Sequence, residues 1–166
     1  MNMPLAIIAL VTAPALAAGP PASPPPVSAP QPAPSAFLGQ WKLDIGSTAP
    51  GDAGPASVTA EFTDAGAGLW NTVYVITARD GSVRRMTSRE RLDGKAVPVA
   101  GDQSVADSVA MTSPQPDMLV MGLTKGGTLG SVRVYTLSAD GSEMIENATV
   151  VGEDGKPAVL RFRWVR

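Results

Sequence analysis

The sequence contains no cysteine and no histidine. Without cysteine the chain can form no disulfide, thiolate nucleophile or Cys-ligated zinc site, and it offers no thiol for the lipid of a lipoprotein. Without histidine it can have no Ser-His-Asp triad, no histidine metal ligand and no histidine pH switch. These absences exclude much of hydrolytic and metal-dependent chemistry, whereas a small stable β-barrel needs neither residue.

Charge is also scarce. Charged residues make up 17% of the 166 residues, and the formal net charge is -2 with a pI near 5.0. This balance gives no electrostatic case for nucleic acid or an anionic membrane as a partner. Hydrophobic residues make up 44%, which suffices for one domain with a packed core.

The N-terminal region has no ionisable side chain before Lys42. An apolar stretch, "MPLAIIALV", covers residues 3–11, and a small-x-small sequence follows and ends at Ala17. This pattern predicts a signal peptide over residues 1–17 that is cut after Ala17. We therefore expect a periplasmic or secreted protein with no integral membrane span after cleavage.

A retained membrane anchor is the alternative, although Pro4 and Pro14 weaken it and the apolar stretch is at the short limit for spanning, about 17 residues. Residues 18–36 cannot bury apolar area, because they consist mainly of proline, alanine and serine. We expect them to form a disordered tail with polyproline II character. The folded domain is then expected over residues 37–166.

The body of the chain reads as strands separated by turns, with no convincing helix period. Four Asp-Gly pairs predict tight hairpins of type I′, in which both central residues need a positive φ; they begin at Asp80, Asp93, Asp140 and Asp154. Gly126-Gly127 is a fifth turn signal. Nine runs between them predict strands: 39–44, 57–63, 69–78, 82–91, 108–112, 118–124, 128–138, 143–151 and 158–165.

Many sequential antiparallel strands must protect their edges, and closure into a barrel does so. Side chains alternate cleanly in two of the runs, which place on one face Val58, Ala60 and Phe62, and Leu160, Phe162 and Trp164. We predict an all-β, antiparallel, up-and-down β-barrel of about eight to ten strands. A β-sandwich is the alternative.

Gly39 and Trp41 form a Gly-x-Trp motif near the start of the first strand. The motif resembles the opening of the calycin barrels, which include the lipocalins and fatty-acid-binding proteins. The segments "LDGKAVPVAGDQSVADSVAM" (92–111) and "YTLSADGSEMIENATVVGEDGKPAVLRF" (135–162) are similar to exported bacterial lipocalin-like proteins, a group without an established activity.

The resemblance implies that Trp41 closes one end of the barrel beneath an arginine from the last strand, with Arg163 the first choice and Arg161 the second. Gly39 is implied to permit a close approach of the backbone. All three roles are structural. The chain departs from fatty-acid-binding proteins after the first strand, because residues 45–57 are too rich in glycine and proline for their two lid helices.

Motifs for other chemistries are absent from the sequence. It contains no phosphate-binding loop, no nucleophile elbow and no EF-hand calcium loop, so no cofactor or metal is expected. A carboxylate pair for acid–base catalysis stays open, but most Asp residues lie in turns. Glu146, in the middle of a predicted strand, is the one carboxylate to check, and we expect it to face solvent.

The basic cluster "RRMTSRER" (84–91) offers an anion site if Arg85 and Arg89 point inward, because a guanidinium binds a carboxylate with two hydrogen bonds. The alternative is a solvated outer face. Larger apolar residues are candidates for the lining of a cavity or simply for the core; those we select as ligand-binding candidates, beside the two arginines, are Trp70, Tyr74, Met118 and Met121.

The leading functional hypothesis is a non-enzymatic, exported, lipocalin-like protein that binds a small hydrophobic or amphipathic molecule. The second is a cell-envelope protein with a filled barrel, packed by Phe62, Leu160 and Phe162, that acts through its outer surface. A carboxylate-based hydrolase is a distant third. The oligomeric state stays open.

Overall fold

The computed structural model describes residues 35–47, 54–151 and 154–166. The predicted signal peptide and all but the last two residues of the predicted tail lie outside these ranges. The strands are β1 (Gly39–Leu43), β2 (Ser57–Gly66), β3 (Leu69–Thr77), β4 (Val83–Arg91), β5 (Val97–Pro98), β6 (Ala100–Gly101), β7 (Ser108–Gln115), β8 (Met118–Lys125), β9 (Thr128–Leu137), β10 (Glu143–Val151) and β11 (Pro157–Val165), with a 3-10 turn η1 (Ile45–Ser47) after β1.

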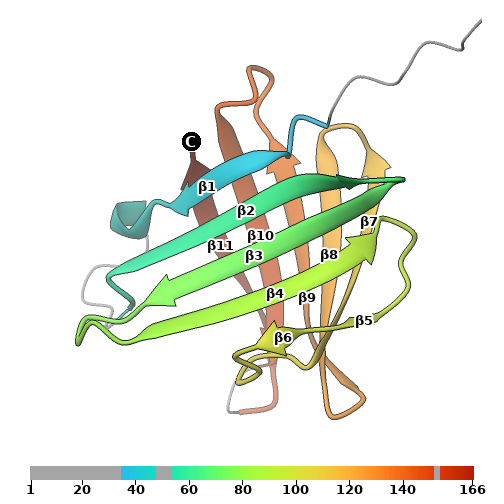
Figure 1. The fold of residues 1–166 in the computed structure, drawn as a ribbon. Coiled ribbons are helices and arrows are strands. Elements are labelled where there is room, and N and C mark those ends of the chain that lie inside the picture. Colours follow the sequence, from blue (N-terminus) through green and yellow to red (C-terminus); the bar gives the residue numbers. More distant parts are fainter. Residues whose placement is uncertain (1–34, 48–53, 152–153) are drawn as a thin grey trace, which may run out of the picture. The chain divides into compact units, whose positions relative to one another are not determined.

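The eleven strands form one antiparallel sheet in the order β5-β7-β8-β9-β10-β11-β1-β2-β3-β4-β6. The sheet curls so that β2, β3 and β4 form one wall and β7 to β11 form the wall behind it (Figure 1). Because β1 pairs with both β2 and β11, the two walls are continuous and the sandwich alternative is wrong. The prediction of an antiparallel barrel is confirmed, and the barrel is nearly closed.

The remaining gap lies between β4 and β7, the two long strands that have no ladder with each other. Two short strands that we did not predict cover it: β6 pairs with β4, and β5 pairs with β7. Gly101 in β6 has a φ of +87°, and a Cβ there would overlap the backbone oxygen of Arg85. The segment 97–101 therefore needs glycine at this position to lie against β4.

Three of the four Asp-Gly pairs lie in hairpin turns, at 80–81, 140–141 and 154–155, but none of these turns is of type I′. The expectation of a hairpin at Asp93-Gly94 is wrong, because β4 pairs with β3 and β6 whereas β5 pairs with β7. Only the glycines have a positive φ, which is +84° for Gly81 and +68° for Gly141, and Ala67 is the one non-glycine residue with a positive φ in the described ranges. The aspartate instead accepts hydrogen bonds from its own turn: Ser82 N–H donates to Asp80 Oδ1 at 2.9 Å. In the β9–β10 hairpin the hydroxyl of Ser138 and the backbone of Ser142 hold the pKa of Asp140 at about 2.

Trp41 fills one end of the barrel, as the Gly-x-Trp motif implies. Its ring is fully buried, and its Nε1–H donates to Phe37 O at 2.8 Å. The guanidinium over the ring belongs to Arg166, whose Cζ lies 4.4 Å from the ring centroid. Arg166 also donates to the carbonyl oxygens of Ala36 and Leu38, so Ala36, assigned to the tail from the sequence, contacts the barrel.

The expectation that Arg163 covers Trp41 is therefore wrong, and the register explains why. Lys42 pairs with Val165, so the next position along places Arg166 opposite Trp41. Arg163 alternates with the buried Trp164 and consequently lies on the outer side of β11. There its Nη1 pairs with Asp44 at 3.0 Å, and its Nε donates to Glu143 at 3.1 Å.

The half of the barrel nearest Trp41 is filled with aromatic side chains. The ring of Phe62 lies 6.0 Å from that of Trp70 and 6.3 Å from that of Tyr74, and Tyr74 packs edge-on against Trp164 at 6.1 Å. Such tilted and edge-to-face pairs add stability beyond the area that they bury. Leu160, at the opposite end, is 46% exposed, so it does not pack this core.

Replacing Trp41 with alanine should lower the free energy of unfolding by about 3–5 kcal/mol, because the change leaves a large cavity at the closed end. Urea denaturation followed by circular dichroism measures the loss. Trp41→Phe, which keeps an apolar ring but removes the bond to Phe37, should lose less. An unchanged midpoint for Trp41→Ala would contradict the role of the indole as the plug of the barrel.

Candidate functional site

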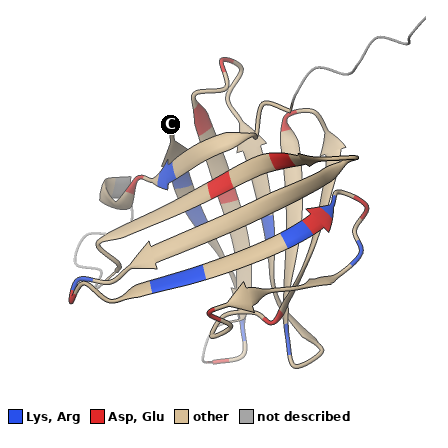
Figure 2. Cartoon of the chain, viewed as in Figure 1, with Lys and Arg blue, Asp and Glu red and all other residues tan. Residues whose placement is uncertain are grey.

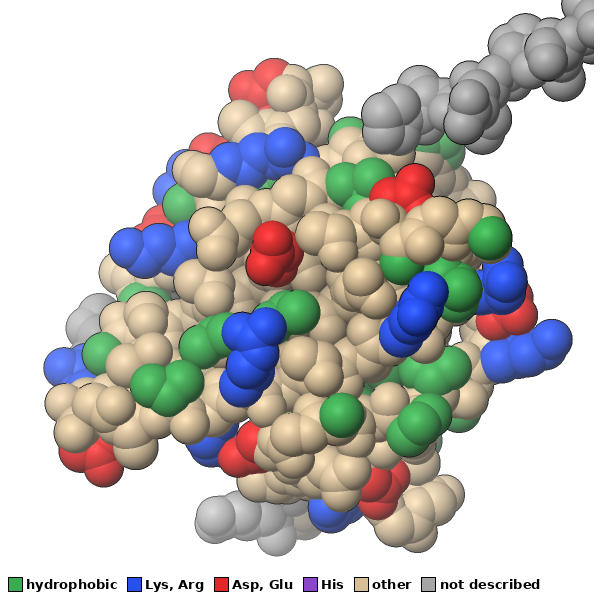
Figure 3. Space-filling model, in the orientation of Figure 1, with side chains coloured by type: hydrophobic (Ala, Val, Ile, Leu, Met, Phe, Trp, Pro, Cys, Tyr) green, Lys and Arg blue, Asp and Glu red, His purple; other side chains and the backbone are tan. Residues whose placement is uncertain are grey.

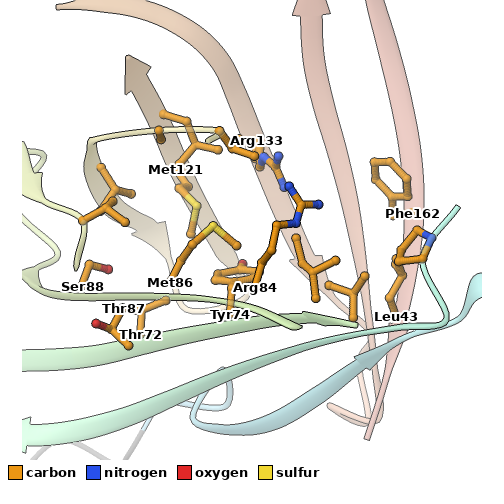
Figure 4. A pocket seen from close by; sticks show the side chains of 18 of the residues that line it. Leu43, Thr72, Tyr74, Arg84, Met86, Thr87, Ser88, Met121, Arg133 and Phe162 are labelled. Atoms are coloured by element: carbon orange, nitrogen blue, oxygen red, sulfur yellow. The ribbon is translucent and has the colours of Figure 1, made fainter. Parts of the chain in front are cut away.

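A cavity of about 300 Å³ occupies the half of the barrel away from Trp41. Its walls come from the inward-facing residues of both sheet walls and from the segment 99–106, which crosses the open end beside β4 (Figure 4). Most of the lining is apolar. Met86 and Met121 point into the cavity from β4 and β8, and Leu123 and Phe162 also line it. Methionine suits such a wall because its flexible thioether adapts to ligands of different shape.

Two tyrosines meet inside the barrel, and one of them, Tyr74, lines the cavity. Tyr74 on β3 and Tyr135 on β9 come from opposite walls, and their hydroxyl oxygens lie 3.1 Å apart in a hydrogen bond across the barrel. Burial raises the pKa of both hydroxyls, so both stay protonated. The pair is therefore a neutral polar group at the wall of the cavity.

A buried ion pair between Arg133 and Glu146 lies near the two tyrosines. Arg133 Nη1 donates to Glu146 Oε1 at 2.9 Å, and Trp164 Nε1–H donates to Glu146 Oε2 at 2.8 Å. Glu146 is 1% exposed, so the expectation that it faces solvent is wrong. It alternates with the buried Met144 and Ala148, a pattern in the sequence that places it inside.

The pKa values in this cluster follow from burial and charge. Burial raises the pKa of Glu146, while the charge of Arg133 and the hydrogen bond from Trp164 act in the opposite direction. Burial opposes the charge of Arg133, but Tyr135 and Glu146 more than offset it and raise its pKa. The guanidinium is therefore charged and has its counter-ion inside the barrel.

A second carboxyl, Glu90, is fully buried without a cation. It accepts a hydrogen bond from the hydroxyl of Thr72 at Oε1, and within the described ranges Oε2 has no partner. Burial raises its pKa, and hydrogen bonds from Thr72 and Ser88 oppose the rise. Thr72 and Ser88 also line the cavity, so this polar group lies at the cavity wall formed by β3 and β4. The sequence analysis did not identify it as a site.

The open end of the cavity carries a third polar group. Arg84, near the start of β4, lines the cavity, is exposed, and donates through Nη1 to Ser104 Oγ at 3.1 Å. Ser104 in turn donates its N–H to Asp102 Oδ1 at 2.9 Å. Lys125 Nζ holds the same segment by donating to Gln103 O at 2.7 Å. These contacts attach the segment 99–106 to the rim of the barrel.

The two arginines expected inside are on the outer face. Residues 84, 86, 88 and 90 share the inner face of β4, so Arg85 and Arg89 alternate outward and are exposed. Basic residues lie near both ends of β4 (Figure 2), and acidic and basic side chains are interspersed on the wall formed by β2, β3 and β4 (Figure 3). The alternative of a solvated outer face describes Arg85 and Arg89 correctly.

The four apolar candidates divide between the cavity, the core and the outer face. Tyr74 and Met121 line the cavity, and their contact with a ligand stays a prediction. Trp70 is buried against Phe62 in the filled half and is not part of the lining. Met118 alternates with the buried Leu119 and Met121, so it lies on the outer face of β8.

Clusters of metal-ligating side chains and membrane-spanning helices are both absent from the described residues. Within them, no group of three or more acidic side chains is placed to hold a metal ion. Across the same ranges, no helix has the length and apolar character needed to cross a membrane.

No family model matches the sequence, and no curated protein matches it significantly. Among solved structures, two variants of the fluorescent protein UnaG are similar, with TM-scores of 0.51 and 0.50 at 13% and 12% identity; the matches cover 79% and 80% of this chain and 96% of each of those chains. Zebrafish ileal bile acid-binding protein complexed with cholic acid has a TM-score of 0.48 at 15% identity, with 80% of this chain and 99% of that chain covered.

At these identities the likeness to UnaG establishes the fold alone. The chain has a nearly closed antiparallel barrel that is similar to the fold of UnaG, and the predicted barrel fold is confirmed. Membership of an exported bacterial group stays a prediction.

Replacing Glu90 with glutamine should stabilise the protein increasingly as the pH rises from about 4.5. A carboxyl whose pKa is raised in the folded state favours folding while it is protonated, and this contribution is lost as the pH rises through that folded-state pKa. The difference in unfolding free energy between Glu90→Gln and the parent, measured in urea from pH 4 to pH 8, should therefore grow with pH. A constant difference would show that Glu90 titrates alike in the folded and unfolded chains.

Proposed function

We propose that this protein is an exported, non-catalytic binding protein for a small hydrophobic or amphipathic molecule, which it holds in the cavity at the open half of the barrel. The cavity itself carries the proposal. At about 300 Å³ it lies at the lower end of the range of ligand pockets, and it combines apolar walls with a few polar groups.

The alternative of a barrel filled with side chains is less well supported. The filled-barrel hypothesis requires Phe62, Leu160 and Phe162 to pack the interior together. Phe62 packs the closed half, but Phe162 lines the cavity and Leu160 is largely exposed at the open end. These side chains leave the space between β4, β8 and β9 unfilled.

A non-catalytic role is supported by how the buried carboxyls are used. Acid–base catalysis by two carboxyls requires both to face a substrate. Glu146 is engaged by Arg133 and Trp164, Glu90 is bonded to Thr72, and neither belongs to the lining of the cavity. The polar groups that do face the cavity are donors, such as Arg84 and Ser88, which suit binding.

Export is supported by the apolar stretch of residues 3–11 and by the small-x-small sequence that ends at Ala17, although the segment before this stretch lacks the Lys or Arg that is usual in a signal peptide. If the signal peptide is cut as proposed, N-terminal sequencing of the full chain expressed in a bacterial host and recovered from the periplasm should begin at Ala18. Recovery of the uncut chain with the membrane fraction would instead show that the apolar stretch is kept as an anchor.

Filling the cavity should abolish binding of a neutral apolar probe. Leu123→Trp places an indole in the cavity, whereas Val120→Trp adds the same group to the outer face of β8. N-phenyl-1-naphthylamine should become fluorescent with the parent and with Val120→Trp, and its affinity should fall about tenfold or more with Leu123→Trp, a loss of about 1.4 kcal/mol.

Equal binding by both tryptophan variants would place the probe elsewhere and remove the support for a binding barrel. Circular dichroism of both variants establishes that they are folded before the titration. The probe is uncharged, so this test does not depend on any arginine.

A further inference from the structure

We propose that the ligand is a single-chain amphiphile ending in an oxyanion, and that it binds with this head at Arg84 on the rim and its apolar chain in the barrel. This inference rests on the proposed function, since it names the ligand class and the orientation for the same cavity. It follows from the different states of the two arginines that face the cavity, Arg84 and Arg133 (Figure 4).

Arg133 already has a counter-ion inside the barrel, at Nη1, whereas its Nε is buried without a hydrogen-bond partner in the described residues. Glu146 lies 2.9 Å from its Nη1 and is itself fixed by Trp164, and the three side chains come from three adjacent strands, β9, β10 and β11. A ligand carboxylate that approached Arg133 would enter beside a carboxyl that cannot move away, and like charges in such a site repel strongly. An anionic head is therefore disfavoured in the depth of the cavity.

Arg84 has a different set of partners. It donates a hydrogen bond to the neutral hydroxyl of Ser104, and none of the ion pairs within the described residues involves it. The carboxylate of Asp102 lies behind Ser104, and its pKa is lowered first by the Ser104 hydrogen bonds and then by the charges of Arg84 and Lys125. Arg84 and Lys125 thus share one acidic neighbour, Asp102. The guanidinium of Arg84 therefore keeps N–H donors for the oxyanion of a ligand.

The lining of the cavity is consistent with a head at the rim. Its lining residues include two guanidiniums and no carboxyl from the described part of the chain, and because Glu146 compensates Arg133, the positive charge open to an anion is at Arg84. Arg84 pairs with Ile76 next to the β3–β4 hairpin, whereas Ser88 lies four residues further in on the same face of β4. At about 3.3 Å per residue, this face runs roughly 13 Å from the rim to the inner wall.

The side chains along this depth suit a hydrocarbon chain. The lining beyond Arg84 includes Met86 on β4, Val109 on β7 and Met121 on β8, together with Tyr74, whose hydroxyl is neutral and bonded to that of Tyr135. Val105 lines the cavity and is 43% exposed, so an aliphatic chain meets an apolar contact as it enters. The charged head can stay hydrated at Arg84, which avoids the cost of burying it.

The experiment compares decanoate with decanol, which share a chain and differ in the charge of the head. The parent should bind decanoate about fivefold more tightly than decanol, because an exposed ion pair contributes a free energy of that size. High salt screens the ion pair, so it should reduce this preference. Arg84→Gln should bind the two equally and keep the parent's affinity for decanol. The matched control is Arg85→Gln on the outer face, which should keep the preference.

A second measurement tests the orientation. Trp164 lines the inner part of the cavity, so bromine on the last carbon of the chain should quench tryptophan fluorescence more than bromine beside the carboxylate. 10-Bromodecanoate should therefore quench more strongly than 2-bromodecanoate. The reverse order would place the head at Arg133 and overturn the inference.

The failures of the two proposals are distinguishable. If neither decanoate nor decanol binds and N-phenyl-1-naphthylamine also fails, the proposed function is wrong. If both bind with equal affinity, or if Arg84→Gln keeps the preference, the barrel still binds apolar molecules and only the assignment of the head to Arg84 is overturned.

Discussion

The pairing of the first strand with the last is the constraint on which the rest of the structure depends. β1 is hydrogen-bonded to β2 on one side and to β11 on the other, so two walls that are distant in sequence become one curled sheet. The same register brings Arg166 over Trp41 and closes that end. Because the indole is buried and its N–H is satisfied by Phe37, the closed end is apolar and fully packed.

Closure at one end leaves the interior divided into two unlike halves. The aromatic side chains of Phe62, Trp70 and Trp41 fill the first half. In the other half the inward positions leave a cavity, whose lining is mostly apolar and includes Met86 and Met121. A barrel of this size can thus be stable through one half and keep the other available for a ligand.

The charged groups inside the barrel and at its rim differ in how they are compensated. The buried carboxyl of Glu146 has a guanidinium and an indole N–H as partners, whereas that of Glu90 has only hydroxyl groups. The pair at Arg133 is internally compensated, so the positive charge available to a ligand is at Arg84 on the rim. An amphipathic ligand is therefore best accommodated with its charge outside and its chain inside, the arrangement with the smaller desolvation cost.

The sequence by itself determined the fold class, the turns and the inner face of several strands, because period-2 alternation and Asp-Gly pairs are local signals. Alternation alone also places Glu146 with Met144 and Ala148, although the expectation of a solvent-facing residue overlooked it. Only the tertiary structure decided that Arg84 rather than Arg85 faces inward, that Arg166 rather than Arg163 covers Trp41, and that two-residue strands cover the gap. These outcomes depend on strand register and barrel closure, which are set by contacts between distant residues, and a shift of one residue reverses every side chain.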